Sequence, residues 1–195
     1  GTNGDNYNIT KTEGTLTVTN RPDGAKYEIT VTANSTTATY DGNVHEAAGF
    51  ETTEFTENGK KFTVEGLSTE NPKATNAGTY TNNITGTAVV KDADGNDVTD
   101  QFVVKTANGS LVINKRSVTL KSADLSKPYD GTALVNGDTA LATETGWAKD
   151  EGATYSFTGS QTLAGFSANA FSYTLKDGTN GDNYNITKTE GTLTV

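Results

Sequence analysis

Residues 178–195 read GTNGDNYNITKTEGTLTV, and residues 1–18 read the same letters. The copies begin at residues 1 and 178, so the sequence has a period of 177 residues. An identity of this length predicts an array of repeated units. We expect residues 1–18 to be the closing segment of a preceding repeat.

A second, more diverged repeat lies inside this period. Tyr40-Asp41-Gly42 matches Tyr129-Asp130-Gly131, an offset of 89 residues from Tyr40 to Tyr129. DQFVVKTANGSLVI at 100–113 also aligns without gaps on DNYNITKTEGTLTV at 182–195. The long period therefore contains two related modules.

These matches predict a domain organisation. Residues 1–18 are expected to be the terminal hairpin of a preceding repeat, residues 19–114 the first β-module and residues 115–195 the second. The connection between the modules, at 114–116, is short. Short connections limit bending, so we expect an elongated arrangement.

The predicted fold is all-β. Threonine is the commonest residue, and Thr, Val, Ile and Tyr favour strands. In the segment 100–113 apolar residues recur with a period of two, at Phe102, Val104, Leu111 and Ile113, on both sides of a Gly-containing turn. This pattern predicts a β-hairpin with one buried face.

Two all-β architectures remain open. NAGTYT at 76–81 is typical of the turn and tyrosine of an immunoglobulin-like sandwich, in which the tyrosine hydroxyl bonds back to the chain. We place its counterpart in the second module at 169–174. The rival is a β-grasp, ubiquitin-like module, because the stretch 143–150 is weakly helical.

The composition excludes several partners. The net charge is −9, which does not suit binding to nucleic acid or to anionic lipid. No apolar stretch is long enough to span a bilayer, so we expect no membrane insertion. Cysteine is absent, which excludes disulfides, thiolate metal sites and a cysteine nucleophile.

The repeated motifs resemble a known family. Tyr-Asp-Gly near each module start, Ala-Gly-Thr-Tyr-Thr in the middle and Asp-x-aromatic…Gly-x-Leu-x-apolar at the end resemble the tandem MBG and YDG repeats of large bacterial cell-surface adhesins. The resemblance implies a secreted, wall-attached or filamentous protein whose modules act as stalk or fibre body. An alternative that it also implies is a weak, multivalent adhesin module for host glycan or mucin. The expected partners are neighbouring repeats and identical chains, end to end or laterally.

Only one segment resembles a metal site. Asp92, Asp94, Asn96 and Asp100 place oxygen donors at loop positions 1, 3, 5 and 9, as a calcium loop does. Calcium loops have a glycine at position 6 and a glutamate at position 12, and this segment has neither. We therefore prefer to interpret it as the polar tip of a hairpin. Apart from this calcium hypothesis we expect no cofactor.

Trp147 is the one candidate ligand-binding residue. Its ring has no counterpart in the first module and could stack on a sugar, although core packing is the simpler role. Tyr40, Tyr80, Tyr129 and Tyr184 repeat with the framework, so we expect them to pack in the core or in turns. His45 is the only histidine and follows a turn, with no nucleophile motif nearby. We therefore expect no catalytic residues and no enzyme.

Overall fold

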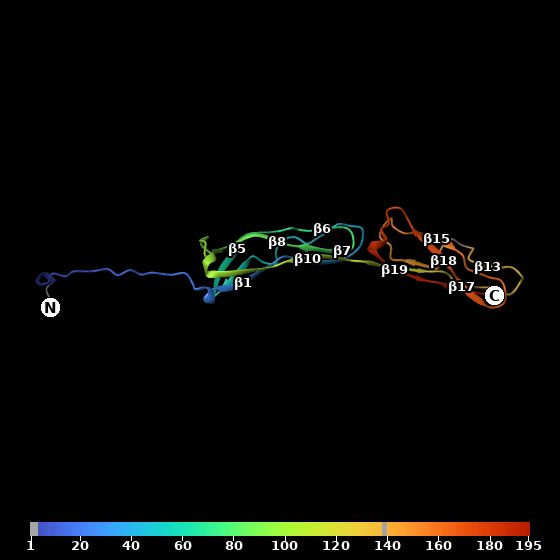
Figure 1. Ribbon diagram of the computed structural model, residues 1–195, viewed down its shortest axis with the longest axis horizontal. Helices are drawn as coiled ribbons and strands as arrows, with labels where there is room; N and C mark the ends of the chain where they lie inside the picture. Colours follow the sequence, from blue (N-terminus) through green and yellow to red (C-terminus); the bar gives the residue numbers. More distant parts are fainter. Residues whose placement is uncertain (1–3, 138–139) are drawn as a thin grey trace.

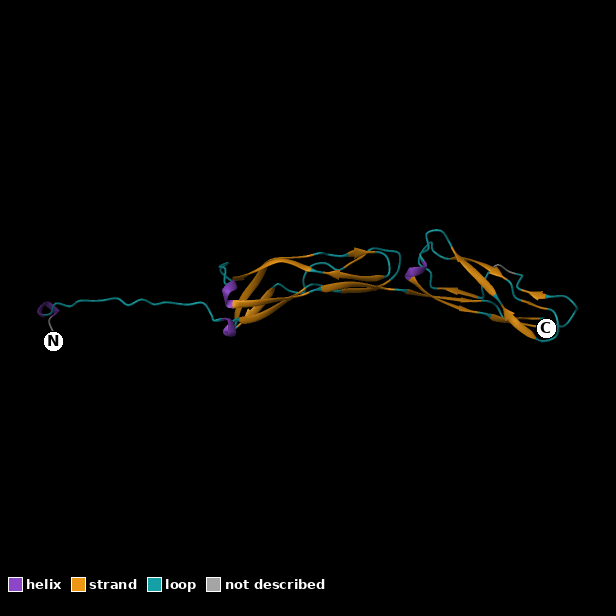
Figure 2. Ribbon diagram, viewed as in Figure 1, coloured by secondary structure: helices purple, strands orange, loops and turns teal. Residues whose placement is uncertain are grey.

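The computed structural model describes residues 4–137 and 140–195, and these residues form an all-β fold (Figures 1 and 2). The predicted fold class is therefore confirmed, and the small sheets are consistent with a β-sandwich. The strands before residue 115 are β1 (Tyr27–Thr32), β2 (Thr36–Thr39), β3 (His45–Glu46), β4 (Glu54–Glu57), β5 (Lys60–Thr69), β6 (Lys73–Ala74), β7 (Gly78–Asn82), β8 (Ile84–Asp92), β9 (Phe102–Ala107) and β10 (Gly109–Asn114).

The strands after residue 115 are β11 (Arg116–Lys121), β12 (Leu125–Ser126), β13 (Leu134–Val135), β14 (Thr143–Thr145), β15 (Ala153–Phe157), β16 (Ser160–Gln161), β17 (Phe166–Asn169), β18 (Phe171–Leu175), β19 (Tyr184–Thr189) and β20 (Gly191–Thr194). Four short 3-10 helices complete the described elements: η1 (Gly4–Asn6), η2 (Asp23–Ala25), η3 (Thr99–Gln101) and η4 (Gly181–Asn183).

Every strand pairing in the described residues joins two strands on the same side of residue 115. We call β1–β10 the first sheet group and β11–β20 the second sheet group. In Figure 1 the two groups follow one another along the long axis of the molecule. The hydrogen-bonded ladders therefore separate at the connection that the sequence singled out.

The two sheet groups share most of their strand pairings, although β11 also pairs with β14, whereas among the described strands β1 pairs with β9 alone. In the first group β1 pairs in parallel with β9, and β10 lies between β2, its parallel partner, and β7, its antiparallel partner. In the second group β11 pairs in parallel with β19, and β20 lies between β12 and β17 with the same directions. The sheet β4-β5-β8 has its counterpart in the pair β15-β18. The diverged repeat in the sequence thus corresponds to a repeated set of strand pairings.

The predicted closing hairpin is wrong. β9 and β10 do not pair with each other, because the first pairs with β1 and the second with β2 and β7. Only Asn108 separates them, which is too short for a chain reversal, since the tightest common hairpin loops have two residues. The segment therefore continues in one direction and passes from one sheet to another. Gly109 allows this passage, because a Cβ there would lie 2.2 Å from the carbonyl oxygen of Asn34.

The duplicated segment takes two different forms in the chain. Residues 184–194 form β19 and β20, whereas the described residues 7–19 form no strand, so the hairpin predicted at 1–18 is absent there. In Figure 1 this N-terminal stretch extends away from the first sheet group. The first strand begins at Tyr27, eight positions after residue 19.

Buried apolar residues form two clusters. One lies within the first sheet group and consists of Ile29, Val31, Val64, Val90 and Phe102. The other contains residues of both groups, namely Tyr40, Ala47, Leu111, Ile113, Val118, Leu120, Ala148, Phe171 and Tyr184. Apolar packing therefore continues across residue 115, although the ladders do not.

The helix expected for a β-grasp module is not formed. Residues 143–145 are strand β14, which pairs with β11, and the described residues contain no α-helix. In the part of the chain that the structure describes, none of the helices is long and apolar enough to cross a membrane. The tyrosine expected of a sandwich is present, since the Tyr80 hydroxyl donates to the Asn76 carbonyl at 3.1 Å.

The strand pairings correct one internal alignment. Asn82 is the register partner of Gly109, and Asn169 is the partner of Gly191. Both asparagines are buried and donate Nδ2–H to a main-chain carbonyl, at 3.1 and 2.9 Å. The counterpart of 77–82 is therefore 164–169, and the predicted match to 169–174 was wrong.

Candidate functional site at the contact between the sheet groups

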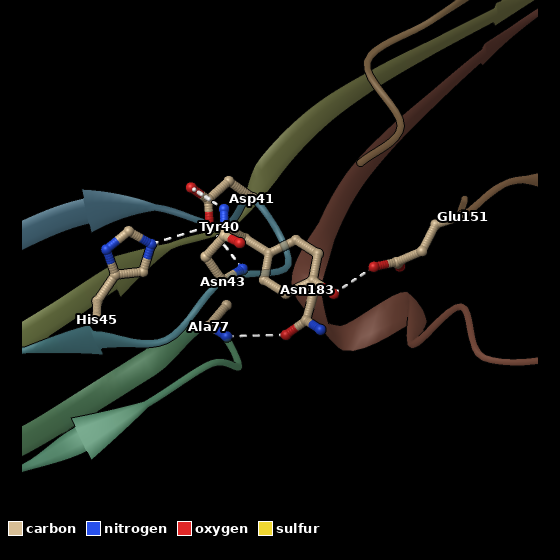
Figure 3. Close-up of polar contacts among 7 residues, drawn as sticks. All are labelled: Tyr40, Asp41, Asn43, His45, Ala77, Glu151 and Asn183. Atoms are coloured by element: carbon tan, nitrogen blue, oxygen red, sulfur yellow. Dashed lines mark hydrogen bonds and ion pairs between the residues drawn. The ribbon is translucent and has the colours of Figure 1, made fainter. Parts of the chain in front are cut away.

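The Tyr-Asp-Gly motif is a turn that fixes its tyrosine (Figure 3). The Asp41 carboxylate accepts hydrogen bonds from the Asn43 backbone N–H at 2.9 Å, from Asn43 Nδ2 at 3.1 Å and from His45 Nε2 at 3.0 Å. These bonds, first of all those from Asn43, lower the pKa of Asp41 to about 2. Gly42 has a φ of 84°, a conformation that favours glycine. The His45 side chain is half-buried.

Tyr40 reaches from the first sheet group into the second. Its backbone N–H bonds to the Asn114 carbonyl at 2.9 Å, and its hydroxyl donates to Glu151 Oε1. Its ring packs edge-on against Tyr184, with centroids 5.4 Å apart. The Tyr184 hydroxyl donates to Glu151 Oε2 at 2.9 Å and accepts the Ala148 N–H at 3.1 Å. One carboxylate thus receives hydrogen bonds from both tyrosines.

Asn183 forms a second link across the contact. It lies in η4, whose start is capped by the Asn180 side chain, and it is buried. Its Oδ1 accepts the Ala77 N–H at 2.8 Å, and its Nδ2 donates to Asn76 Oδ1 at 3.0 Å (Figure 3 draws the Ala77 bond). A buried amide with partners on both of its polar atoms fixes the relative placement of the two groups.

Trp147 packs beside this contact. Its ring lies edge-on to Tyr184 with centroids 4.9 Å apart, and its Nε1–H donates to Glu144 Oε1 at 3.0 Å. It is partly buried against the cluster that spans the two groups. The structure therefore brings the predicted ligand-binding residue into the contact as a packing residue.

The two Tyr-Asp-Gly tyrosines have different surroundings. Tyr40 is 5% exposed, whereas Tyr129 is 61% exposed at the far end of the second group, so its predicted packing role is not seen. The motif around Tyr129 is nevertheless intact. The Asp130 carboxylate accepts the Thr132 N–H at 2.9 Å and Lys127 Nζ at 2.8 Å.

The four residues of the calcium hypothesis do not converge. The Asp92 carboxylate accepts N–H groups of Asp94 and Asn96 at 3.0 and 2.9 Å and the Asn96 side chain at 3.1 Å. Asp100 lies apart in η3 and accepts a hydrogen bond from Asn20 at 3.0 Å. No group of three or more acidic or histidine side chains in the described residues could hold a metal ion. The loop closes on its own amides as a polar turn, and calcium binding stays a prediction.

Glu151 and Asn183 are the site residues that the sequence did not indicate. Asn183 aligns with Gln101 and Tyr184 with Phe102 in the repeat, so the second group has a longer-reaching phenol and a shorter amide at these positions. This difference between the two copies of the repeat is the one feature of the sequence that could have pointed to Asn183. Comparisons of the chain with protein-family models, with curated proteins and with solved structures found no match.

We expect the contact to weaken between about pH 10 and pH 12. Burial is the main cause that raises the pKa of Tyr40, and it also raises the pKa of Tyr184 to about 12. The hydrogen bonds to the Glu151 carboxylate raise both pKa values further. An unfolded tyrosine has a pKa of about 10, so the stability that these shifts contribute is complete below pH 10 and is lost as the pH rises through 12. The measurement is the melting temperature as a function of pH, together with tyrosinate absorbance. Tyr184→Phe should reduce the absorbance change near pH 12 by the contribution of one tyrosine, and an unchanged amplitude would contradict the assignment.

Proposed function

We propose that the chain is a structural repeat unit, part of the stalk or fibre body of an extracellular bacterial surface protein. Its role in that setting is to cover distance, without catalysis. The observation that carries the proposal is the contact at Tyr40, Glu151 and Asn183, which holds one sheet group against the next. We treat the two sheet groups as the two tandem modules, because no described strand pairing crosses residue 115.

Three features support a spacer. The short connection at 114–115 leaves little slack between β10 and β11. Hydrogen bonds and ring contacts cross the contact, so bending there breaks them. The long axis runs through both groups in succession (Figure 2). An array of such units is long and resists bending.

The extracellular setting is supported by the resemblance of the repeats to surface adhesins. The net charge of −9 opposes non-specific association of neighbouring copies. Limited proteolysis of intact cells that carry the parent protein tests this setting. Cleavage by a protease that cannot enter the cell supports it, and full protection contradicts it.

Solution scattering of the unchanged chain and of variants altered at the contact tests the spacer role. We expect the unchanged chain to scatter as an extended particle. Tyr40→Ala combined with Asn183→Ala should free the contact, so the largest distances in the pair-distance distribution become less frequent. The matched control is Tyr129→Ala, which alters the same motif at an exposed position and should leave the scattering unchanged. Circular dichroism establishes that each variant keeps its strands.

Two results would contradict the spacer proposal. One is compact, globular scattering from the unchanged chain, and the other is identical scattering from all three proteins. A glycan and mucin array on the same samples tests the alternative function. Specific binding that Trp147→Ala abolishes would favour the adhesin module, whereas an array without binding leaves the spacer role.

A further inference from the structure

The end of the first sheet group at η3 repeats half of the contact between the groups. Gln101, the last residue of η3, is the counterpart of Asn183. Its Oε1 accepts the Arg21 N–H at 3.3 Å, and its Nε2 donates to Asn20 Oδ1 at 3.1 Å. Asn183 binds residues 76 and 77 through the same two kinds of hydrogen bond. Each sheet group therefore uses this amide to bind an asparagine and the residue that follows it.

The same amide of the first sheet group lines a cavity of about 220 Å³. Aromatic rings form much of the cavity wall, since the Phe102 ring centroid lies 5.6 Å from that of Tyr27 and 4.8 Å from that of Phe62. The Arg21 guanidinium lies over the Tyr27 ring, 4.3 Å from its centroid, and Lys60 also lines the cavity. Walls of this kind suit a planar aromatic ring.

The strand register identifies what fills the corresponding place in the second sheet group. Glu151 and Lys60 each lie two residues before the strand residue that pairs with the last residue of β18 or of β8. The residue before each of them has a positive φ, 65° in the second group and 74° in the first. Tyr40 donates to Glu151 and packs on Tyr184. The cavity at Lys60 and Phe102 is therefore the counterpart of the place that the Tyr40 ring occupies.

We propose that this cavity binds the Tyr-Asp-Gly turn of a second copy of this chain, with the Tyr129 ring as the inserted group. Tyr129 is the counterpart of buried Tyr40 and is 61% exposed. The two turns have the same conformation, since φ is 80° at Gly131 and 84° at Gly42. In both, the aspartate carboxylate accepts the N–H two residues further on at 2.9 Å. The proposal does not depend on the spacer function, because it follows from these contacts alone.

The hydroxyl of the inserted ring would have a different partner in the two sites. In the existing contact the Tyr40 hydroxyl donates to the carboxylate of Glu151. The ammonium group of Lys60 can only donate, so the Tyr129 hydroxyl would accept a hydrogen bond from it. A phenol can do either, and the ring contacts are of the same kind in both sites. The substitution of lysine for glutamate therefore preserves a tyrosine site.

The proposed contact joins the second sheet group of one copy to the first sheet group of the next. Such head-to-tail contacts produce an open, linear assembly. The contact is small and has no covalent link between its partners, so we expect it to be half-populated only at about 1 mM. At micromolar concentration the chain is therefore monomeric, and Tyr129→Ala remains a valid control for scattering from dilute samples.

Sedimentation equilibrium of the full chain tests the proposal. We expect the weight-average mass to rise about twofold as the concentration increases from about 10 μM to about 1 mM. Tyr129→Ala removes the inserted ring, and Lys60→Trp fills the cavity from an exposed position of β5. Each variant should keep the monomer mass throughout. The matched control is Tyr173→Ala, which removes another partly exposed tyrosine of the second group and should associate like the unchanged chain.

A mixture of the two monomeric variants tests the head-to-tail geometry. Tyr129→Ala keeps the cavity and Lys60→Trp keeps the turn, so the mixture can form one contact per pair and should stop at the dimer. Circular dichroism establishes that each variant keeps its strands. An unchanged chain that stays monomeric at about 1 mM would overturn the proposal. Association that either variant retains, or a mixture that stays monomeric, would overturn it as well.

Discussion

Replacing Leu193 by alanine is expected to lower the free energy of unfolding of the second sheet group by about 2–5 kcal/mol. Leu193 lies on the central strand of the β12-β20-β17 sheet and is 0% exposed, so the substitution leaves a cavity in a packed interior. The measurement is denaturant unfolding followed by the fluorescence of Trp147, which lies in the same group.

The sequence itself supplies the control. Leu16→Ala makes the same substitution within the same eighteen letters, at a side chain that is 99% exposed. We expect it to change the free energy of unfolding by less than about 0.5 kcal/mol. Equal losses from both substitutions would show that residues 1–18 are as well packed as their copy.

Gly109→Ala is expected to lower the free energy of unfolding of the first sheet group by about 3 kcal/mol, the upper part of the range for overpacking. The added Cβ would lie 2.2 Å from the Asn34 carbonyl oxygen and 2.5 Å from that of Ala33. Both are main-chain atoms, so a rotamer change relieves neither contact. Urea unfolding followed by circular dichroism measures the effect.

Gly14→Ala is the matched substitution for Gly109. Gly14 occupies the same position of the repeat, since it aligns with Gly191 and hence with Gly109, and no atom would lie within 4 Å of its added Cβ. We expect no measurable loss of stability. A Gly109→Ala protein of unchanged stability would mean that Gly109 lies farther from the carbonyl groups of residues 33 and 34 than in the structure.

The repeats made most of the fold predictable. The offset between the Tyr-Asp-Gly motifs matched β1 to β11, and the period of two along 100–113 placed Phe102, Leu111 and Ile113 in the interior, where they are buried. These predictions succeeded because side-chain alternation is a local property of a strand.

Pairing partners were not predictable in the same way. A period of two shows which side chains are buried but not which strand lies alongside, so two segments in line were taken for a hairpin. The segment 76–81 was wrongly aligned with 169–174 because Tyr80 and Tyr173 are residues of the same type. The buried asparagines Asn82 and Asn169, which bond to main-chain carbonyls, mark the true register.

The candidate site was predictable only in part. Tyr40 and Tyr184 were assigned to packing because they recur with the framework, and both are buried. Glu151 and Asn183 were missed, because each bonds to a residue of the first sheet group, Tyr40 for Glu151 and Ala77 for Asn183. Such a contact has no periodicity, so its members resemble ordinary polar residues of turns.

The direction of the strands determines how the molecule would respond to a pulling force. β1 and β9 run in parallel through six register pairs, and β2 and β10 continue side by side through four more. The chain enters and leaves the first group along these neighbouring segments, so tension between its ends slides one along the other. The ladder bonds are then loaded together instead of opening one at a time, and the group yields only when many of them break at once.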